Sequence, residues 1–234
     1  MYIIEFKDIT KAFGSKKILD NVNLKISKGD IFGIIGPSGS GKSTLMKVLM
    51  GIYKPTSGSI YFKEKEVLKD SNFLLKVTGL TTQENSFYYK LTVKENMHYY
   101  ANLNSVQMNK KDLDVHINKI LRSVNLYDSK DKLAQNISGG MKRRLDFAIS
   151  LVHNPELLIL DEPTTGLDPK LVDQFWKIIK EVSKEGKTII VISHIFSELE
   201  KNCNKAGILY NGKIKSVTVK RGVDLRKEFD RVVK

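Results

Sequence analysis

The segment GPSGSGKST, Gly36 to Thr44, limits what this chain can fold into more than any other feature of its sequence. It follows the apolar run DIFGIIG, which is typical of a buried strand, and it opens the helix-like run KSTLMKVLMG. The pattern G-x-x-x-x-G-K-[ST] in that context is typical of a loop that binds phosphate groups. Its glycines allow successive backbone N–H groups to point at one anion, and the helix N-terminus adds partial positive charge. We therefore predict a strand–loop–helix unit that binds a nucleotide phosphate.

Individual roles within this loop follow from the same pattern. Lys42 is expected to reach the β- and γ-phosphates, Ser43 to hold Mg²⁺ and Thr44 to contact the α-phosphate. The alternative, an ordinary glycine-rich turn, is disfavoured because a chance match in a chain of this length has a probability on the order of one per cent. The predicted nucleotide-binding residues of the loop are Gly36, Pro37, Ser38, Gly39, Ser40, Gly41, Lys42, Ser43 and Thr44.

A second motif, LLILDEP at residues 157–163, places two adjacent carboxylates after an apolar strand. Proteins of the α/β class bind their ligands at the C-terminal ends of strands. Asp161 is expected to bind Mg²⁺ through water, and Glu162 is expected to polarise the water that attacks the γ-phosphate. Alone, such a motif is often only a strand end that meets solvent. In a chain that also carries the phosphate loop, it predicts the second half of a hydrolytic site.

The order of elements indicates an α/β fold with an inserted helical region. Strands are expected where residues alternate or form short apolar runs, and helices where apolar residues recur with a helical period. Buried strands that alternate with helices indicate a parallel sheet, whereas the middle of the chain shows helices alone. The expected strands are 2–6, 22–26, DIFGIIG, the end of PTSGSIYF, ELLILD and KTIIVIS; the expected helices are KSTLMKVLMG, 92–103, 112–124, 138–153, 169–184 and 195–203, followed by a hairpin at Asn211-Gly212.

Composition excludes several classes of protein. The longest apolar runs are far too short to span a bilayer, and the N-terminus lacks the pattern of a signal peptide. Cys203 is the only cysteine, which excludes an internal disulfide and fits a reducing cytosol; a small, semi-buried apolar side chain is its expected role. The net charge of +13 comes mostly from scattered lysines, so it hints at an anionic partner without defining a function.

The segment ISGGM, residues 137–141, lies between the two phosphate-site motifs, and together they resemble the nucleotide-binding subunit of an ATP-binding cassette (ABC) transporter. The resemblance covers nearly the whole chain. It implies a P-loop NTPase core, with a RecA-like mixed or parallel sheet and an antiparallel β subdomain, plus an inserted α-helical subdomain. Residues 1–83 and 156–234 are expected to form the nucleotide-binding core of a single domain 1–234. Residues 84–155 are expected to form the helical signature subdomain.

ISGGM occupies the position of the family signature, usually written LSGGQ. The resemblance implies a head-to-tail dimer of two cassettes. In it, Ser138 and the N–H groups of Gly139 and Gly140 of one cassette would bind the γ-phosphate of the ATP that the other cassette holds. A plain helix N-cap is the alternative for Ser138, and both roles are compatible. Ile137 for Leu is conservative, whereas Met141 replaces the final glutamine and weakens any role assigned to that side chain. The form SGGMKRRL is similar to the branch that serves ABC-2-type exporters of drugs, antibiotics, peptides and polysaccharides.

Four further positions match the family one at a time. Phe13 lies where an aromatic ring stacks on adenine, with a core phenylalanine as the alternative. Gln83 matches the loop glutamine that touches Mg²⁺ and links the two subdomains. Asp168, which ends TTGLD, resembles the loop that crosses the dimer interface and is also a good N-cap before Pro169. His194 resembles the switch histidine that contacts the γ-phosphate.

The resemblance also implies partners. The segment 84–100 next to Gln83 contains five aromatic residues, in the neighbourhood where the family forms a groove for a coupling helix of a polytopic membrane subunit. We expect about three of these rings to fill the core, and Tyr88 and Tyr89 to lie on the surface. The basic surplus would suit a peripheral protein at the cytoplasmic face of a membrane.

Two other functions remain open at this stage. A soluble ABC ATPase acting on nucleic acid would suit the positive charge, but such proteins typically carry two cassettes or a long coiled-coil insertion, so nucleic acid is an unlikely partner. An importer ATPase often adds a regulatory domain beyond the switch histidine, whereas about forty residues follow it here.

The terminal segment KRGVDLRKEFDRVVK is expected to be a short amphipathic helix, with Val223, Leu225 and Phe229 facing inward. Core padding, membrane contact and an incomplete accessory element are all open for it.

Overall fold

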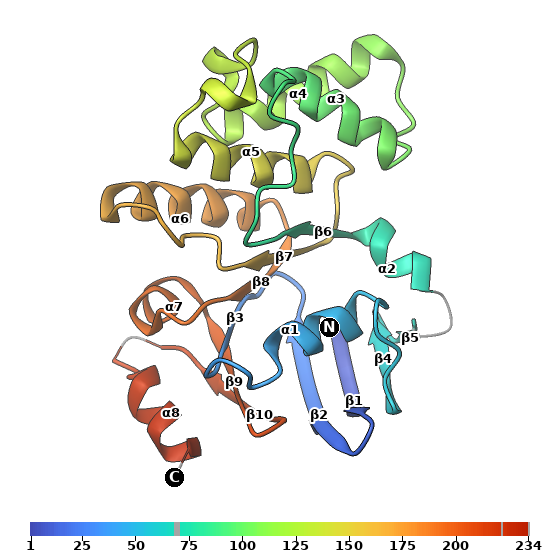
Figure 1. Cartoon of the computed structure of the whole chain (residues 1–234), viewed down its shortest axis with the longest axis vertical. Coiled ribbons are helices and arrows are strands. Elements are labelled where there is room, and N and C mark those ends of the chain that lie inside the picture. The colour runs from blue at the N-terminus through green and yellow to red at the C-terminus, as the bar shows by residue number, and fades with distance from the viewer. Residues whose placement is uncertain (68–70, 221, 234) are drawn as a thin grey trace. The chain divides into compact units, whose positions relative to one another are not determined.

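The computed structural model describes residues 1–67, 71–220 and 222–233. The chain forms two compact units, shown in Figure 1: unit 1 comprises Met1–Leu75 and Gly186–Lys234, and unit 2 comprises Lys76–Glu185. These units differ in their bounds from the predicted nucleotide-binding core and signature subdomain, and that functional division stays a prediction. No helix in the described ranges has the length and hydrophobicity needed to cross a membrane.

The first sheet of unit 1 is antiparallel. It has four strands in the order β2-β1-β4-β5, and β1 and β2 are longer than the strands expected at 2–6 and 22–26. In β2, buried apolar residues alternate with exposed polar ones from Val22 to Ile26, because a sheet with one wet face buries every second residue. Strand β1 departs from this alternation, since register shifts interrupt its pairing with β2. The strands are β1 Tyr2–Phe13, β2 Lys16–Ser27, β4 Ser57–Phe62 and β5 Lys65–Glu66.

The remaining strands of unit 1 lie in the order β10-β9-β3-β8, with β3 parallel to both β8 and β9. Residues of β3 and β8 are almost all buried, as expected for strands covered on both faces. The predicted hairpin is confirmed: Asn211 and Gly212, both with positive φ, join β9 to β10. These elements are β3 Ile31–Ile35, β8 Thr188–Ile192, β9 Lys205–Tyr210 and β10 Lys213–Thr218, with α1 Lys42–Leu49 and α7 Phe196–Asn202.

The C-terminal helix α8, Leu225–Val233, packs on unit 1. Leu225 is fully buried, and its backbone N–H donates to the Glu200 carboxylate at 2.6 Å. Phe229 meets the ring of Phe196 edge-on, with centroids 5.3 Å apart. Of the alternatives open for the terminal segment, padding of the core is therefore confirmed for α8. Arg221 and Lys234 of that segment lie outside the described residues.

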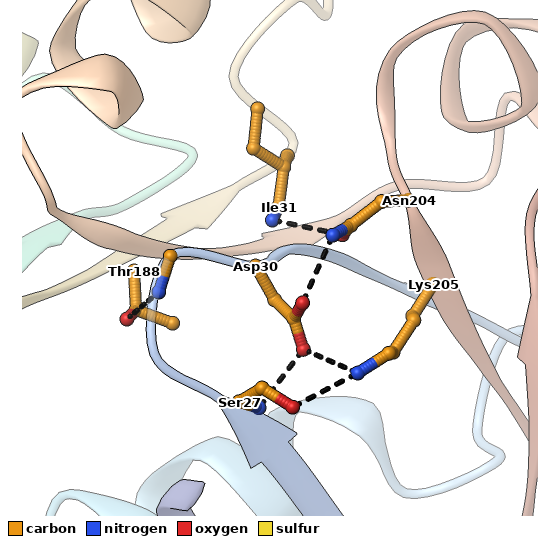
Figure 2. A network of polar contacts seen from close by, with 7 residues as sticks. Ser27, Asp30, Ile31, Thr188, Asn204 and Lys205 are labelled. Atoms are coloured by element: carbon orange, nitrogen blue, oxygen red, sulfur yellow. Dashed lines mark hydrogen bonds and ion pairs between the residues drawn. The ribbon is translucent and has the colours of Figure 1, made fainter. Parts of the chain in front are cut away.

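A polar network centred on the buried Asp30 joins three elements of unit 1 at the N-terminal ends of β3, β8 and β9 (Figure 2). Asp30, only 5% exposed, accepts hydrogen bonds from the backbone N–H of Ser27 at 2.8 Å, from Asn204 Nδ2 at 2.9 Å and from Lys205 Nζ at 2.9 Å. Asn204 Oδ1 accepts in turn from the backbone N–H of Ile31 at 3.0 Å. Asp30 therefore ties the turn before β3 to residues more than 170 positions further along the chain.

Replacing Asp30 with Ala should destabilise the fold strongly. The change removes the acceptor of two N–H groups and the carboxylate partner of Lys205, which is 34% exposed and keeps its hydrogen bond to Ser27 Oγ at 2.9 Å. Loss of the three hydrogen bonds to this buried carboxylate costs about 3 kcal/mol. For a chain of this size, that corresponds to a fall of about 6–12 °C in the melting temperature. Thermal unfolding followed by circular dichroism measures it. The control is Asp20→Ala, which removes an exposed ion pair with Lys17 and should leave the melting temperature unchanged.

Unit 2 contains two parallel strands, β6 Thr78–Thr81 and β7 Leu157–Asp161. Its helices confirm the predicted all-helical middle of the chain, and α6 has the predicted bounds. Strand β6 contacts α5 so closely that a Cβ on Gly79 would lie 2.1 Å from the backbone oxygen of Ser150. The helices are α3 Val93–Leu103, α4 Lys110–Ser123, α5 Gly139–Leu151 and α6 Pro169–Lys184; the short helix α2, Ser71–Val77, spans the boundary between the units.

The five aromatic residues in segment 84–100 are more exposed than expected. Tyr88 and Tyr89 lie on the surface as predicted, but Tyr99 is also exposed and Tyr100 is half-buried. Only Phe87 is fully in the core. The prediction that three of these rings fill the core is therefore wrong. Tyr88 and Tyr99 contact each other at the surface instead. Their hydroxyls share a hydrogen bond of 3.0 Å, and their rings meet edge-on.

Candidate functional site

The loop from Gly36 to Thr44 is shaped for close approach of its backbone to a ligand. Gly36 directly follows β3 and has no room for a side chain, because a Cβ there would lie 2.3 Å from the backbone oxygen of Leu209. Gly41 precedes α1 with φ of +106°, a conformation that only glycine adopts readily. The Lys42 ammonium folds over the loop and donates to the carbonyls of Gly36 at 2.8 Å and Pro37 at 3.0 Å. A cation and a helix N-terminus thus converge on one loop.

This donor set fits the phosphates of ATP. It offers backbone N–H groups, a helix N-terminus and a lysine ammonium, and no acidic side chain occurs in the loop. The Ser43 side chain, one residue into α1, is exposed and available to a metal bound by the phosphates. No group of three or more His, Cys, Asp or Glu side chains that could hold a metal occurs within the described ranges. Mg²⁺ does not require one, because it keeps several waters and takes its other ligands from substrate phosphates.

His194 lies at the same sheet edge of unit 1 as the phosphate loop. Strands β3 and β8 are parallel with Ile34 opposite Ile192, so the residues that follow each strand emerge side by side. The backbone N–H of Ser193 donates to the Ile34 oxygen at 3.2 Å, which continues this pairing to the start of the loop. The His194 side chain is exposed beyond it. This position supports the prediction of a histidine that contacts the γ-phosphate.

Phe13, at the end of β1, is 46% exposed, so the alternative of a core phenylalanine is wrong. Its ring meets the Tyr53 ring edge-on with centroids 5.3 Å apart, and Lys11 Nζ lies 4.7 Å from its centroid. An exposed aromatic face beside a lysine suits a nucleobase, which binds by stacking. Its contact with adenine remains a prediction.

Residues around the phosphate loop also line a pocket of unit 1. Its volume is about 320 Å³, and it opens beside the turn that joins β9 to β10. Two lysines at its rim give it positive charge. It is lined by Lys16, Lys17, Ile18, Pro37, Ser38, Gly39, Ser40, Tyr210, Asn211 and Gly212.

In unit 2, the parallel pair β6 and β7 places Gln83 and the two adjacent carboxylates at one sheet edge. Thr81 pairs with Leu160, so Gln83 follows β6 at the edge where Asp161 ends β7 and Glu162 follows it. Glu162 has φ of +49°, which is uncommon for a residue with a side chain and occurs often at functional sites. Its carboxylate accepts a hydrogen bond from Thr165 Oγ1 at 3.3 Å. The backbone at Glu162 therefore leaves the extended conformation of β7.

The signature segment is the N-terminus of α5. Ser138 is its N-cap, and the Ser138 hydroxyl accepts from the Met141 N–H at 3.4 Å, which confirms the capping role. The two glycines differ in their surroundings. Gly140 is buried, and a Cβ there would meet Leu171 at 3.0 Å, whereas a Cβ on Gly139 would meet nothing within 4 Å. Gly140 therefore serves packing, and Gly139 leaves the helix N-terminus open to a ligand.

One pocket of unit 2 brings three predicted segments together. Asp168 caps α6 by accepting from the Leu171 N–H at 3.0 Å, as predicted, and the residues just before it line the pocket. The pocket has a volume of about 490 Å³ and joins residues 82–86 (the Gln83 loop), the signature helix α5 and the loop before Asp168. Asp161 and Glu162 are not among its lining residues, which are Gln83, Glu84, Asn85, Tyr89, Gly139, Lys142, Arg143, Thr165, Gly166 and Leu167.

Three residues of unit 2 with contacts near Gln83 were not predicted from the sequence: Ser86, Arg143 and Asp146. Arg143 Nη1 donates to the Thr82 oxygen at 3.3 Å, and Asp146 accepts from both the backbone N–H and the hydroxyl of Ser86. The available signal was the acidic residue inside the apolar run LDFAIS, because an acidic side chain on a buried helix face requires a partner.

Comparison with known proteins identifies the family. The sequence profile described as "ABC transporter" matches residues 19–165, more than half of the chain. The bacitracin transport ATP-binding protein BcrA of Bacillus licheniformis is 39% identical over 213 residues, which cover 91% of this chain and 68% of that protein. The lantibiotic transport ATP-binding protein SrtF of Streptococcus pyogenes is 38% identical, covering 91% and 89% of the two chains. The Nod factor export ATP-binding protein I of Rhizobium etli is 32% identical, covering 91% and 67%.

Solved structures agree with this assignment. The cbiO1 protein from Clostridium perfringens, part of the ABC transporter complex cbiONQ, superposes with a TM-score of 0.89 at 27% identity, covering 98% of this chain and 92% of that one. A dimeric ATP-binding cassette in a post-hydrolysis state, bound to ADP and Pi, superposes with a TM-score of 0.80 at 26% identity, covering 93% and 99%. The predicted fold class and the predicted family are therefore confirmed: the chain belongs to the ATP-binding cassette family of ABC transporter ATPases.

Proposed function

We propose that this chain is the ATPase subunit of an exporter, which binds and hydrolyses MgATP in a head-to-tail dimer and drives a separate membrane subunit. The observation that carries the proposal is the presence of two ligand-accessible helix N-termini in one chain. One follows the phosphate loop, and the other begins at Ser138 with open space beside Gly139. Each suits a phosphate group by its N–H donors and its dipole.

In this proposal, the phosphate loop of one protomer holds the triphosphate. Backbone N–H groups of Gly39–Lys42 and the Lys42 ammonium bind the β- and γ-phosphates, and Phe13 stacks on adenine. The Ser138–Gly140 terminus of the other protomer binds the same γ-phosphate. Because each chain completes the site of its partner, ATP joins the two protomers and hydrolysis releases them.

The remaining predicted residues act on the attacking water and the phosphate charge. Glu162 accepts the proton of the water, and His194 contacts the γ-phosphate. Ser43, Gln83 and Asp161 would hold Mg²⁺, and the bound ion would neutralise charge on the phosphates. Positioning and electrostatics then carry most of the catalysis. Asp168, next to the loop that lines the unit 2 pocket, would lie at the dimer interface.

The membrane subunit would dock beside Gln83, in the segment that ends at Tyr100. The exposed tyrosines there support this, since exposed aromatic rings are enriched where interfaces form. The net charge of +13 would hold the chain at an anionic cytoplasmic membrane surface. The names of the relatives, which concern bacitracin, lantibiotic and Nod factor transport, favour export over import and over a nucleic-acid function.

Co-purification with a polytopic membrane protein encoded beside this chain tests the proposal. The double variant Tyr88→Ser with Tyr89→Ser should lose the complex, because removing a buried interface tyrosine costs about 2 kcal/mol or more. Tyr2→Ser is the matched control: Tyr2 is 48% exposed against 49% for Tyr88, but it lies in unit 1, and its loss should leave the complex intact. Retention of the complex by the double variant would reject this docking site, and absence of any membrane partner would reject the transporter role.

A further inference from the structure

Asp146 in α5 has no role in the proposed ATPase mechanism, yet its environment is unusual. The residue is 2% exposed and lies between the buried residues Leu145 and Phe147. Acidic side chains are almost never buried to this extent unless they are paired, because removing a carboxylate from water is costly. Burial raises the pKa of the Asp146 carboxyl above its usual range, and hydrogen bonds from Ser86 oppose that rise.

The contacts of Asp146 are directed at a single residue of the Gln83 loop. Its Oδ1 atom accepts from the backbone N–H of Ser86 at 3.0 Å and from the Ser86 hydroxyl at 2.9 Å. Its Oδ2 atom is buried and has no hydrogen-bond partner within the described part of the chain. An unpartnered buried oxygen destabilises a fold. Stability alone therefore does not account for an acid at this position.

A second contact from the same helix holds the other end of that loop. Arg143 lies one turn before Asp146, and its guanidinium donates to the backbone oxygen of Thr82 at 3.3 Å. Residues three apart on a helix share a face, so both side chains reach the loop together. The Tyr100 hydroxyl adds a bond to the backbone oxygen of Ser86. Residues 83–85 are thus held at both ends on α5.

Helix α5 is also the helix whose N-cap is Ser138, so it carries the predicted signature. We propose that Asp146 is a positioning residue, which fixes the Gln83 loop to the signature helix so that the two shift as one piece. This inference rests on the proposed function, in which Gln83 and the Ser138 terminus serve the ATPase reaction. A displacement of the loop by the membrane subunit would then reach the signature helix through Asp146, and a displacement of that helix would reach Gln83.

Three variants of the full chain test this role. Asp146→Leu keeps the volume but removes the acceptor of two hydrogen bonds. It should lower kcat for ATP at least about tenfold while KM stays within about twofold, because each of these hydrogen bonds is worth up to roughly that factor. Asp146→Asn keeps an acceptor oxygen for Ser86 and should restore kcat to within about twofold of the wild type. Ser86→Ala should lower kcat a few-fold, and should cause no further loss when combined with Asp146→Leu.

Hydrogen exchange gives a readout independent of activity. In the nucleotide-free protein, the Ser86 amide should exchange about tenfold faster in Asp146→Leu and at the wild-type rate in Asp146→Asn, because the carboxylate oxygen is its acceptor. Asp114→Leu is the control: it removes a partly exposed acid of unit 2 that pairs with Lys94 and His98, and it should change neither kcat nor the exchange of Ser86.

Unchanged exchange at Ser86 in Asp146→Leu overturns the inference, and so does a kcat within twofold of the wild type. An Asn variant as impaired as the Leu variant also overturns it, because the acceptor oxygen would then not be the property that matters. If Asp146→Leu fails to fold, the Ser86→Ala variant decides alone, and a wild-type kcat in it overturns the inference. Absence of ATPase activity in the wild type would instead reject the proposed function, and the exchange measurement would still test the Asp146–Ser86 contact.

Discussion

Glu162→Gln is expected to lower the steady-state ATPase rate at least about 100-fold, because a general base contributes roughly 10²–10⁴-fold to such a reaction. Glutamine has the shape of glutamate and keeps the oxygen that accepts from Thr165. It cannot take a proton from water. The variant should therefore bind ATP normally, fail to cleave it, and remain in the ATP-bound dimer.

The backbone at Glu162 makes this substitution a clean test. With φ of +49°, this residue carries its side chain in a conformation that costs about 1 kcal/mol or more, and a same-shape replacement leaves that cost unchanged. Any loss of activity then reports the missing base. Release of phosphate from saturating MgATP measures the rate. Glu181→Gln, on the exposed face of α6 beside Lys184, is the control and should hydrolyse ATP at the wild-type rate. Normal turnover by Glu162→Gln would refute the assigned base.

Lys42→Ala is expected to weaken ATP binding about 100-fold, because a factor of 100 is about 2.7 kcal/mol and hydrogen bonds to charged groups are worth about 1.5–3 kcal/mol. The loss has two parts. The ammonium no longer meets the phosphates, and the carbonyls of Gly36 and Pro37 lose a hydrogen-bond donor that stabilises the loop. The loop itself should persist, because Gly36 and Gly41 still permit its backbone path.

Thermal stabilisation by nucleotide measures this change without requiring catalysis. ATP at about 100 times its dissociation constant stabilises the wild type by about 2.7 kcal/mol, whereas a 100-fold weaker variant gains only about 0.4 kcal/mol at the same concentration. Lys47→Ala is the matched control, since Lys47 lies on the same helix but is exposed and contacts the Tyr53 ring. Equal stabilisation of Lys42→Ala and the wild type by ATP would contradict the assigned phosphate loop.

Much of the fold was predictable wherever local signals agreed. Helix α6 has the predicted bounds because a helix-period apolar face, the Asp168 cap and Pro169 at the first position all indicate the same start. The phosphate loop lies between a strand and a helix as its motif requires. The signature serine is an N-cap, as its position before the glycines indicated.

Elements that depend on tertiary contacts were missed. Strand β6, with the sequence TGLT, is too short to alternate, and it exists because it pairs with β7 and lies against α5 at Gly79. Helix α2 was also not predicted. Burial of the tyrosines in segment 84–100 was predicted wrongly, because composition does not reveal that Tyr88 and Tyr99 pair at the surface. Local sequence determines the period and the caps of a helix. It does not determine which distant residues pack against a strand or a side chain.

The candidate site shows the same division. Motifs located the phosphate loop, the carboxylates and the signature, since each depends on residues close in sequence. The Asp30 network and the Asp146–Ser86 contact join residues that are 174 and 60 positions apart, and no local pattern specifies such partners. Only the rule that a buried acid needs donors would have marked Asp146 in advance.

The central claim is that the phosphate loop of one protomer and the Ser138–Gly140 terminus of another bind the same ATP. Light scattering on Glu162→Gln with MgATP tests it, alone and combined with Gly139→Glu. The added carboxylate has open space and a favourable place at a helix N-terminus, so the fold should hold while the γ-phosphate is repelled. We predict twice the chain mass of 26.6 kDa for Glu162→Gln with MgATP and a monomer for the double variant. A monomer in both proteins, or a dimer in both, would contradict the account.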